Sequence, residues 1–497
     1  MPEPLTKVLG ADFELANSIE TARRWGRDVG DASTRLLAEI PGYPRRRVQY
    51  GTTLEWGRRF LSTCAGSAYR DCDHLEINLP EHTHATDHAA LVHAGLAIAR
   101  RAQVAASEKL TDDERLIVTA AVSDGQSSWG HHLNVMGSRE LFNSLTRRPV
   151  VAGFLATHLV TSVLYTGHGM VGSSNGRARC DFQLSQRADW FEEFAGQQTM
   201  QNRPLINLRD ESHAGRELSR IHIIYLDNVL SPVANLLKAG TTQLVLAMAE
   251  AGWADPQVLL DDPLEAALEA SRDLSLSKPL RMCGRGRAWS ALQVQQALAD
   301  LAGEFVAAGA AGSAVPDAEA IVACWRETLE RAQHGSADAL AGRCDWALKF
   351  LLLERHRARR ELSWQSSEMR YLDQLFSSLN PHEGLFWQMA QAGRVEGMPD
   401  SETIDRFTRE PPDDTRAYLR AHVLRRFGDH VVDMDWSEIT FQIQTDRFWW
   451  SRAKLRMTDP ARFGRAEAEP LLEQCGTLDE LIEAVDETSR TNEPAIA

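Results

Sequence analysis

Polar side chains at alternate positions of an apolar extended segment constrain this fold more than any other feature. Segment 7–17, "KVLGADFELAN", alternates apolar residues with acids, namely Leu9, Ala11, Phe13 and Leu15 with Asp12 and Glu14. Because successive side chains of a strand point to opposite faces, this pattern predicts a β-strand with one apolar and one acidic face.

Three further segments carry pairs of ligand-type residues. They hold, in chain order, Asp71 with Glu76, His132 with Asn134, and Arg220 with His222. Pairs on separate strands converge when the strands share a sheet. Carboxylates with imidazole make an oxygen-rich site suited to Mg²⁺ ions that hold a nucleotide triphosphate. Each pair alone is typical of a solvated strand face, but four in one chain favour a common site.

Other segments predict strands followed by helices. Extended segments are predicted over 67–79, over 127–137 and twice within 203–228, where a polar turn joins two strands. In an unbroken strand over 67–79, Tyr69, Asp71 and Asp73 would share a face. Helices are predicted over 88–106, 149–165 and 235–253, and after about residue 255 the chain is mostly helical. The predicted class is α+β.

The C-terminal part is predicted to be a small domain. A Pro-Pro break at 411–412 precedes a basic helix that ends near residue 428. A strand-like segment over 439–450 and an acidic helix follow.

Composition excludes several classes of function. The 497-residue chain has a formal net charge of -15, which argues against a broad basic surface for nucleic acid or anionic lipid, though not against a local basic groove. Its seven scattered cysteines form no CxxC pair and are typical of reduced thiols. The N-terminus does not resemble a signal peptide, and 149–165 is short for a membrane span. We expect a cytoplasmic protein with no nucleic-acid or membrane partner.

The stretch "DCDHLEINLPEHTHATDH" (71–88) suggests zinc as an alternative. His82, His84 and His88 are ligand types with short spacing, but no HExxH or paired-cysteine pattern accompanies them. A polar strand-to-helix connection is the simpler interpretation, and zinc stays a minor alternative.

Longer motifs resemble a known family. They are "GADFEL" (10–15), "FQLSQRADWFE" (182–192), "INLRDESHA" (206–214), "LKAGTTQLVLAM" (237–248) and "PPDDTRAYLRAHVLRRFG" (411–428). Over nearly its whole length the chain resembles the Pup ligases and Pup deamidase/depupylases, and it is closer to the depupylase branch. The resemblance implies a glutamine-synthetase-like antiparallel sheet packed by helices in a catalytic domain over 1–408. A small C-terminal α/β domain over 409–497 would follow.

The resemblance also implies residue roles. "YRDCDHLEINLPE" (69–81) matches the segment that carries the family's catalytic carboxylate, which would be Asp71. The implied metal ligands are Asp12, Glu14, Tyr69, Glu76, His132 and His222. The implied nucleotide contacts are Asn78, Asn134, Arg209, Arg220 and Trp436.

The implied activity depends on ATP and Mg²⁺ and concerns the C-terminal Gln or Glu side chain of a small Pup-like modifier. The favoured direction is hydrolysis of the side-chain amide or isopeptide bond, as in a deamidase/depupylase. The alternatives are a ligase that joins the modifier to a substrate lysine with ATP hydrolysis, and a pseudoenzyme that only binds the modifier. The oligomeric state stays open, with a monomer slightly favoured.

Departures from the family pattern motivate the pseudoenzyme alternative. Asp12, Leu75, Leu133 and Pro232 stand where the family has Glu, Pro, Glu and Glu. The region between Asp12 and Asp71 is also too short for the long loop typical of depupylases. The sequence therefore leaves open whether catalysis is weakened and which modifier is used.

Overall fold

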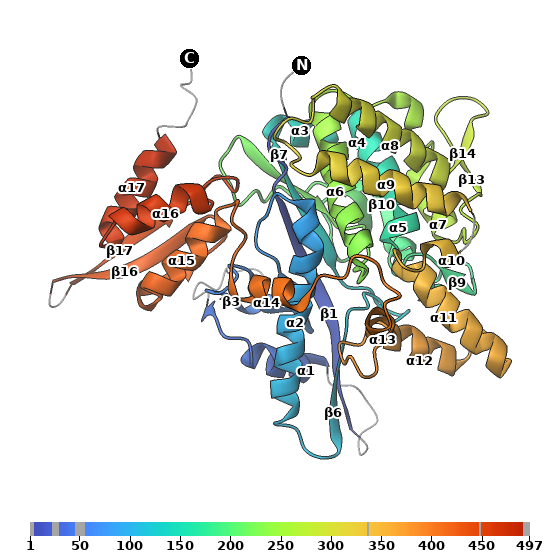
Figure 1. Cartoon of the computed structure of the whole chain (residues 1–497), viewed down its shortest axis with the longest axis horizontal. Coiled ribbons are helices and arrows are strands. Elements are labelled where there is room, and N and C mark those ends of the chain that lie inside the picture. The colour runs from blue at the N-terminus through green and yellow to red at the C-terminus, as the bar shows by residue number, and fades with distance from the viewer. Residues whose placement is uncertain (1–3, 22–28, 45–54, 335–336, 447–448, 491–497) are drawn as a thin grey trace.

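A computed structural model describes residues 4–21, 29–44, 55–334, 337–446 and 449–490 of the chain. Within these residues the main sheet has eight strands in the order β12-β7-β1-β5-β4-β3-β2, with β6 also paired to β1. Figure 1 labels four of them, β1, β3, β6 and β7. Its strands are β1 (Leu9–Thr21), β2 (Tyr43–Pro44), β3 (Glu55–Phe60), β4 (Ser67–Asp71), β5 (His74–Asn78), β6 (Glu114–Thr119), β7 (His131–Ser138) and β12 (Leu218–Ile223). All of their pairings are antiparallel.

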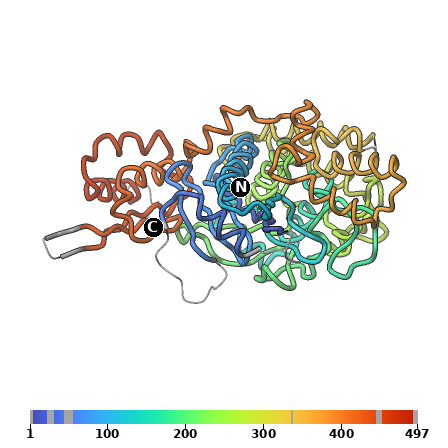
Figure 2. The backbone as a smooth tube through the Cα atoms, turned by 90° about the horizontal axis from the view of Figure 1, so that it is seen from below, coloured from blue at the N-terminus to red at the C-terminus, as the bar shows by residue number. Residues whose placement is uncertain are grey.

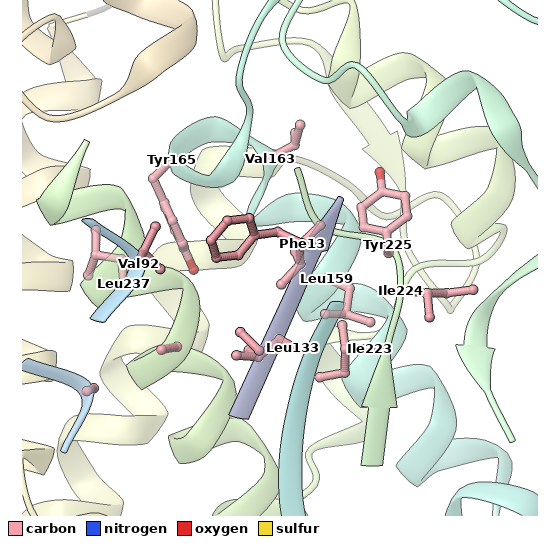
Figure 3. Packing of buried hydrophobic residues seen from close by; sticks show 14 of the residues in the cluster. Phe13, Val92, Leu133, Leu159, Val163, Tyr165, Ile223, Ile224, Tyr225 and Leu237 are labelled. Carbon is pink, nitrogen blue, oxygen red and sulfur yellow. The ribbon is translucent and has the colours of Figure 1, made fainter. Parts of the chain in front are cut away.

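The apolar face of this sheet forms the main core. Phe13 and Leu133 pack there with residues from helices that lie behind the sheet, as Figure 3 shows for Leu159, Tyr165 and Leu237. The covering helices are α1 (Val29–Ala38), α2 (Ala85–Ser107), α4 (Pro149–Thr161), α5 (Val163–Thr166) and α6 (Pro232–Glu250). Full burial of such a side chain stabilises the folded state by roughly 1.5–3 kcal/mol, so the apolar face of each strand turns toward the core. The polar side chains of the same strands must then point to the opposite face of the sheet.

The middle of the chain adds helices and short sheets around this core. The helices are α3 (Arg139–Arg147), α7 (Pro263–Ser271), α8 (Ala291–Ala307), α9 (Ala318–Gln333), α10 (Ala337–Leu340), α11 (Asp345–Arg360), α12 (Ser367–Phe376), α13 (Leu385–Gln391) and α14 (Ser401–Arg409). Helix α8 begins after Ser290, which forms a capping box with Gln293. The short pairs are β8 (Met170–Val171) with β9 (Phe182–Gln183), β10 (Phe191–Gly196) with β11 (Arg203–Asn207), and β13 (Pro279–Arg281) with β14 (Ala288–Ser290).

A second hydrophobic cluster forms at the C-terminal end, which lies at one side of the molecule in Figures 1 and 2. It combines α15 (Ala417–Phe427), β15 (Val431–Met434), β16 (Glu438–Asp446), β17 (Trp449–Arg456), α16 (Arg465–Gln474) and α17 (Leu478–Arg490). Phe60 of β3 also belongs to this cluster. The boundary between residues 408 and 409 stays a prediction.

Two details differ from the sequence predictions. Segment 67–79 is a hairpin, because Cys72 adopts a left-handed φ of 49° and turns the chain between β4 and β5. Asp73 therefore lies in the turn and shares no strand face with Asp71. The two strands within 203–228 belong to different sheets, since β11 pairs with β10 and β12 pairs with β7.

The helices that the structure describes include none long and apolar enough to cross a membrane. Segment 149–165 forms α4 and part of α5, which are buried against the main core.

Candidate active site

The sheet register brings the predicted pairs together on one face. Asp12 lies opposite both His132 and Asn78, in neighbouring strands. Glu14 lies opposite Glu76, which in turn lies opposite Tyr69. His222 lies opposite Asn134. Because successive side chains of a strand point to opposite faces, the apolar neighbours of these residues point into the core.

All twelve residues implied by the resemblance line one cavity of about 630 Å³. They are Asp12, Glu14, Tyr69, Asp71, Glu76, Asn78, His132, Asn134, Arg209, Arg220, His222 and Trp436. The other walls come from the loop before β7, from the segment between residues 187 and 214, and from Arg416 and Pro460 of the C-terminal part. The site therefore lies between the main sheet and the C-terminal cluster.

Three carboxylates in this cavity have the spacing of a metal site. Ligand atoms of Glu14, Asp71 and Glu76 all lie within 4.8 Å of one another. Burial raises the pKa of Glu76 well above its usual range, and the negative charges of Asp12 and Asp71 raise it further. Such a concentration of carboxylates, two of them buried, fits a hard cation such as Mg²⁺.

Asp12 forms a separate group with His132 and Asn134. Its carboxylate Oδ1 lies 3.0 Å from His132 Nδ1, and Asn134 Nδ2 donates to Oδ2 at 3.3 Å. Burial alone would raise the pKa of Asp12, but His132 and Arg220 hold it below the usual value. Among the described residues, the set of mutually close carboxylates does not include Asp12, although the charge of Asp12 acts on Glu76.

The side chain of Glu14, on β1, is held by the residue that precedes β7. The backbone N–H of Gly130 donates to Glu14 Oε1 at 2.6 Å, and His74 Nδ1 lies 3.4 Å from Oε2. Burial opposes ionisation of Glu14, yet the hydrogen bond from His74 and the nearby His132 lower its pKa overall. The carboxylate is thus held ionised and oriented toward its partners.

Asn78 orients the carboxylate of Glu76. Its Nδ2 donates to Glu76 Oε1 at 2.9 Å, while its Oδ1 accepts from Ser67 Oγ at 2.6 Å and Arg58 Nη1 at 2.7 Å. The Arg58 guanidinium also lies 3.7 Å from the ring centroid of Tyr69. The predicted nucleotide contact of Asn78 stays a prediction, and its visible contacts are with the protein.

Basic groups adjoin Asn134. Arg220 Nη1 donates to Asn134 Oδ1 at 3.0 Å, and His222 Nδ1 lies 2.8 Å from the same oxygen. Burial and the charge of Arg220 lower the pKa of His222 well below its usual value, which keeps the imidazole neutral and able to act as a ligand. Arg209 pairs with Glu211 at 2.9 Å. Trp436 packs edge-on against Phe60, with 5.4 Å between ring centroids.

Sequence reasoning did not single out Arg187, Trp190 and Arg203, although all three line the cavity. Arg187 and Trp190 lie within the motif "FQLSQRADWFE", which was interpreted only as a family match. Neither Arg187 nor Arg203 has a second ligand-type residue two positions away on the same strand. The pattern of alternating pairs could therefore not reveal them. His74 and Gly130 were likewise not assigned to the site.

Three of the four departures that the resemblance implies lie away from the cavity lining. Leu75 and Leu133 are fully buried in the main core, on the face opposite the carboxylates. Pro232 opens helix α6 behind the sheet. Only Asp12 changes a side chain on the polar face. The departures at Leu75, Leu133 and Pro232 therefore do not remove a group from the site.

The histidines of 71–88 do not converge on a zinc site. His82 Nε2 lies 3.1 Å from His88 Nδ1 in the buried interior, whereas His84 pairs with Asp317 at 2.9 Å. Within the described ranges, the group with metal-ligand spacing is Glu14 with Asp71 and Glu76. The zinc alternative is therefore not supported.

Comparison with known proteins identifies the family. A family profile described as "Pup-ligase protein" matches residues 6–440. The chain belongs to the Pup-ligase protein family. The resemblance inferred from the sequence motifs is thereby confirmed.

Family members named as hydrolases and as ligases are both similar to this chain. The depupylase of Acidothermus cellulolyticus is 32% identical over 480 residues, which cover 95% of this chain and 90% of the relative. The Pup deamidase/depupylase of Mycolicibacterium smegmatis is 32% identical over 72% of this chain and 70% of the relative. The Pup–protein ligase of Kribbella flavida is 31% identical over 82% of this chain and 89% of the relative.

Solved structures of the family share the fold. PafA, the ligase of the prokaryotic ubiquitin-like protein Pup, matches in its Pup complex with a TM-score of 0.78 and 22% identity, over 99% of this chain and 96% of that chain. PafA in complex with ADP matches with a TM-score of 0.72 and 24% identity, over 84% of this chain and 90% of that chain. The predicted fold class, an antiparallel sheet packed by helices, is confirmed.

Proposed function

We propose that this protein is an ATP- and Mg²⁺-dependent hydrolase that cleaves the side-chain amide or isopeptide bond at the C-terminal Gln or Glu of a small Pup-like modifier. The observation that carries this proposal is the position of Asp71, whose carboxylate lies close to Glu14 and Glu76 on the wall of a large cavity. The names of two relatives, depupylase and Pup deamidase/depupylase, support the direction of hydrolysis. A cytoplasmic location and a monomeric state stay predictions.

The groups that line the cavity suit different parts of the reaction. Asp12, Glu14, Tyr69, Glu76, His132 and His222 would hold Mg²⁺. Bound Mg²⁺ supplies the positive charge that phosphate oxygens require. Asn78, Asn134, Arg209, Arg220 and Trp436 would orient the nucleotide, and the ADP complex of PafA, which shares this fold, supports a nucleotide here.

Asp71 would act on the amide or isopeptide carbonyl. Its carboxylate serves either as a nucleophile that attacks the carbonyl carbon or as a base that takes a proton from the attacking water. Both roles need an ionised carboxylate that faces the modifier. Burial and the negative charges of Asp12 and Asp71 raise the pKa of Glu76, so Glu76 ionises less readily than an ordinary glutamate.

The test replaces Asp71 with asparagine. Asp71→Asn keeps the size of the side chain and removes the ionised oxygen, so we expect hydrolysis of a Gln-terminated Pup to fall at least ~10²-fold. Nucleotide affinity, measured by calorimetry, should stay within about threefold, since Arg209 and Arg220, the groups assigned to the phosphates, are unchanged. The matched control is Asp73→Asn, which changes an exposed turn residue paired with Arg70. Turnover of Asp71→Asn at the wild-type rate would overturn the assignment.

The ligase is the second candidate, because the Kribbella flavida relative is named Pup–protein ligase. In that direction the modifier's terminal Glu is activated with ATP and joined to a substrate lysine. Isopeptide formation with stoichiometric release of ADP would favour the ligase, and hydrolysis without ADP release would favour the depupylase.

The structure weakens the reasons for the pseudoenzyme alternative. Leu133 and Pro232, which suggested weakened catalysis, lie in the main core and at the start of α6. Calorimetry that detects no binding of ATP with Mg²⁺ would revive this alternative.

A further inference from the structure

A β-bulge beside the cavity directs one further arginine into it. The register of β3 against β4 shifts between Trp56 and Arg59, where β3 has one residue more than its partner strand. Gly57 lies in this shift and has a φ of 71°, which glycine adopts freely. Bulges bend a strand and redirect the side chains near them, and Arg58, which follows Gly57, lines the cavity.

Arg58 contacts three buried side chains of β4 and β5. Its Nη1 donates to Ser67 Oγ at 3.0 Å and to Asn78 Oδ1 at 2.7 Å. Its guanidinium carbon lies 3.7 Å from the centroid of the Tyr69 ring, well within cation–π range. Ser67, Tyr69 and Asn78 are all buried. Hydrogen bonds from a charged donor in such surroundings are stronger than those between neutral groups in water.

Both sets of contacts lead from Arg58 to the carboxylate of Glu76. Because Asn78 Oδ1 accepts from Arg58, the amide nitrogen faces the other way and donates to Glu76 Oε1 at 2.9 Å. Burial and the neighbouring carboxylates raise the pKa of Glu76, and a hydrogen bond from the Tyr69 hydroxyl opposes this rise. Arg58 therefore holds two of the groups that hold Glu76.

Glu76 needs such support before a cation binds. It is 3% exposed, and its ligand atom lies within 4.8 Å of those of Glu14 and Asp71. Carboxylates this close repel one another when they are ionised and no cation lies between them. Hydrogen bonds from the protein must then set the direction of each carboxylate, as they commonly do around metal ligands.

We infer that Arg58 is a positioning residue that holds Glu76 in place for a divalent cation. It acts through Asn78 and Tyr69. This inference rests on the proposed function, which brings Mg²⁺ to the cavity. A guanidinium has no acceptor atom and cannot bind a cation itself, so its effect on the metal must pass through its partners. Its planar fork donates to an amide oxygen while its face covers an aromatic ring, whereas lysine carries a single point charge.

The experiment measures metal binding without turnover. Mn²⁺ serves as the probe in place of Mg²⁺, and electron paramagnetic resonance measures free Mn²⁺ while it is titrated into the protein with saturating ADP. Arg58→Gln should raise the Kd for Mn²⁺ roughly 10- to 100-fold, the range for losing a group that orients a metal ligand. Equal Kd values for the wild type and Arg58→Gln would overturn the inference.

Arg59→Gln is the matched control. Arg59 is the next residue of β3, and it donates to the carbonyl of Ile40 at 2.6 Å. The substitution makes the same chemical change on the same strand, so the Kd for Mn²⁺ should stay at the wild-type value. An equal rise in Arg59→Gln would mean that β3 as a whole is disturbed, which would overturn a specific role of Arg58. The melting temperature of each variant checks that it folds.

Two more variants test how Arg58 acts. Arg58→Lys keeps the positive charge and loses the planar fork, so its Kd for Mn²⁺ should lie near that of Arg58→Gln. In an Asn78→Ala background, Arg58→Gln should raise the Kd by a smaller factor, because one of the two connecting groups is already missing. A wild-type Kd in Arg58→Lys, or an unchanged factor in the Asn78→Ala background, would contradict the inference.

Activity separates a positioning role from direct contact with the substrate. For hydrolysis of Gln-terminated Pup at saturating ATP, Arg58→Gln should require more Mg²⁺ and should recover kcat when Mg²⁺ is in excess. A loss of kcat that excess Mg²⁺ does not restore would mean that Arg58 contacts the substrate, and the inference would be wrong.

Failure of the proposed function is distinguishable, because the Mn²⁺ titration needs no turnover. If the wild type binds Mn²⁺ and hydrolyses no Pup, the proposed hydrolase is wrong while the titration still tests Arg58. If the wild type binds no Mn²⁺, the inference is wrong together with the metal site.

Discussion

At the scale of single residues, Gly130 shows how little space the acidic face of the sheet leaves for a further side chain. A Cβ atom at this position would lie 2.6 Å from Glu14 Oε1 and 2.8 Å from His132 Cε1. Both contacts are closer than real Cβ atoms tolerate, so any side chain here must displace two candidate metal ligands. The glycine is needed for space, since its backbone N–H approaches Glu14 directly.

We therefore predict that Gly130→Ala weakens Mg²⁺ binding while the protein stays folded. Displacing the groups that orient a ligand typically costs roughly 10- to 100-fold in metal affinity. The measurement is a Mg²⁺ titration of hydrolysis at saturating ATP, with the melting temperature as a check on folding. Gly153→Ala is the control, because its nearest non-local contact would be an ordinary 3.6 Å to Leu259. Unchanged Mg²⁺ dependence in Gly130→Ala would show that Glu14 and His132 are not ligands.

The site residues that could be predicted from the sequence are those that form a local pattern along the chain. Alternation identified Asp12, Glu14, His132 and Asn134, because the period of a strand places each pair on one face. Arg187 and Arg203 line the same cavity only because of the fold, and neither belongs to an alternating pair of ligand types on a strand. Their burial and unpaired donors became visible once distant segments were brought together.

At the scale of elements, the β4–β5 hairpin sets the geometry of Asp71 and Glu76. Its turn at Cys72 and Asp73 has no Asn-Gly or Asp-Gly signal, so the sequence predicted one extended segment. Long-range contacts stabilise the turn instead. Asn17 of β1 donates to the carbonyl of Asp73 at 3.0 Å and accepts from the N–H of Leu75 at 2.8 Å. Such contacts cannot be inferred from local propensity.

We predict that the hairpin tolerates glycine at position 72 and is disturbed by valine. Cys72 has a φ of 49°, which glycine adopts freely and a β-branched residue resists. Cys72→Val should lose about 1–2 kcal/mol of unfolding free energy relative to Cys72→Gly. Urea denaturation of both variants measures this difference, and kcat reports whether Asp71 has shifted. Equal stability of the two variants would contradict a turn that depends on left-handed backbone at this residue.

At the scale of the whole molecule, a buried ion cluster joins the C-terminal part to the main sheet. Glu81 follows β5 and accepts from Arg416 Nε at 2.8 Å and from Arg420 Nη1 at 3.1 Å, while Arg420 also donates to the carbonyls of Ala65 and Trp436. Since Trp436 lines the cavity, the same cluster that holds the two parts together positions one wall of the site. The sequence predicts a small domain at the C-terminal end, which stays a prediction, but it could not reveal this junction, because the junction joins residues more than 300 positions apart.

The junction predicts how stability depends on pH. Burial alone would raise the pKa of Glu81, but Arg420 and Arg416 lower it to about 2, from an ordinary 4.5. The stabilisation is therefore fully present above about pH 5 and is lost as the pH falls toward 2, and the full shift corresponds to about 3 kcal/mol. Glu81→Gln leaves two buried guanidinium groups without their partner, so it should cost roughly 3–5 kcal/mol at pH 7.

Urea denaturation of the wild type and Glu81→Gln between pH 7 and pH 3 tests this prediction. The difference in unfolding free energy should narrow as the pH falls, because protonation removes from the wild type the charge that the variant already lacks. Glu438→Gln is the control, since it alters a more exposed pair with Lys454 and Arg456 and should change stability by about 1 kcal/mol or less. A difference for Glu81→Gln that stays constant over this range would mean that the carboxylate does not hold the two parts together. Loosening of the junction should also raise the KM for ATP at pH 7, because Arg420 holds the backbone of Trp436.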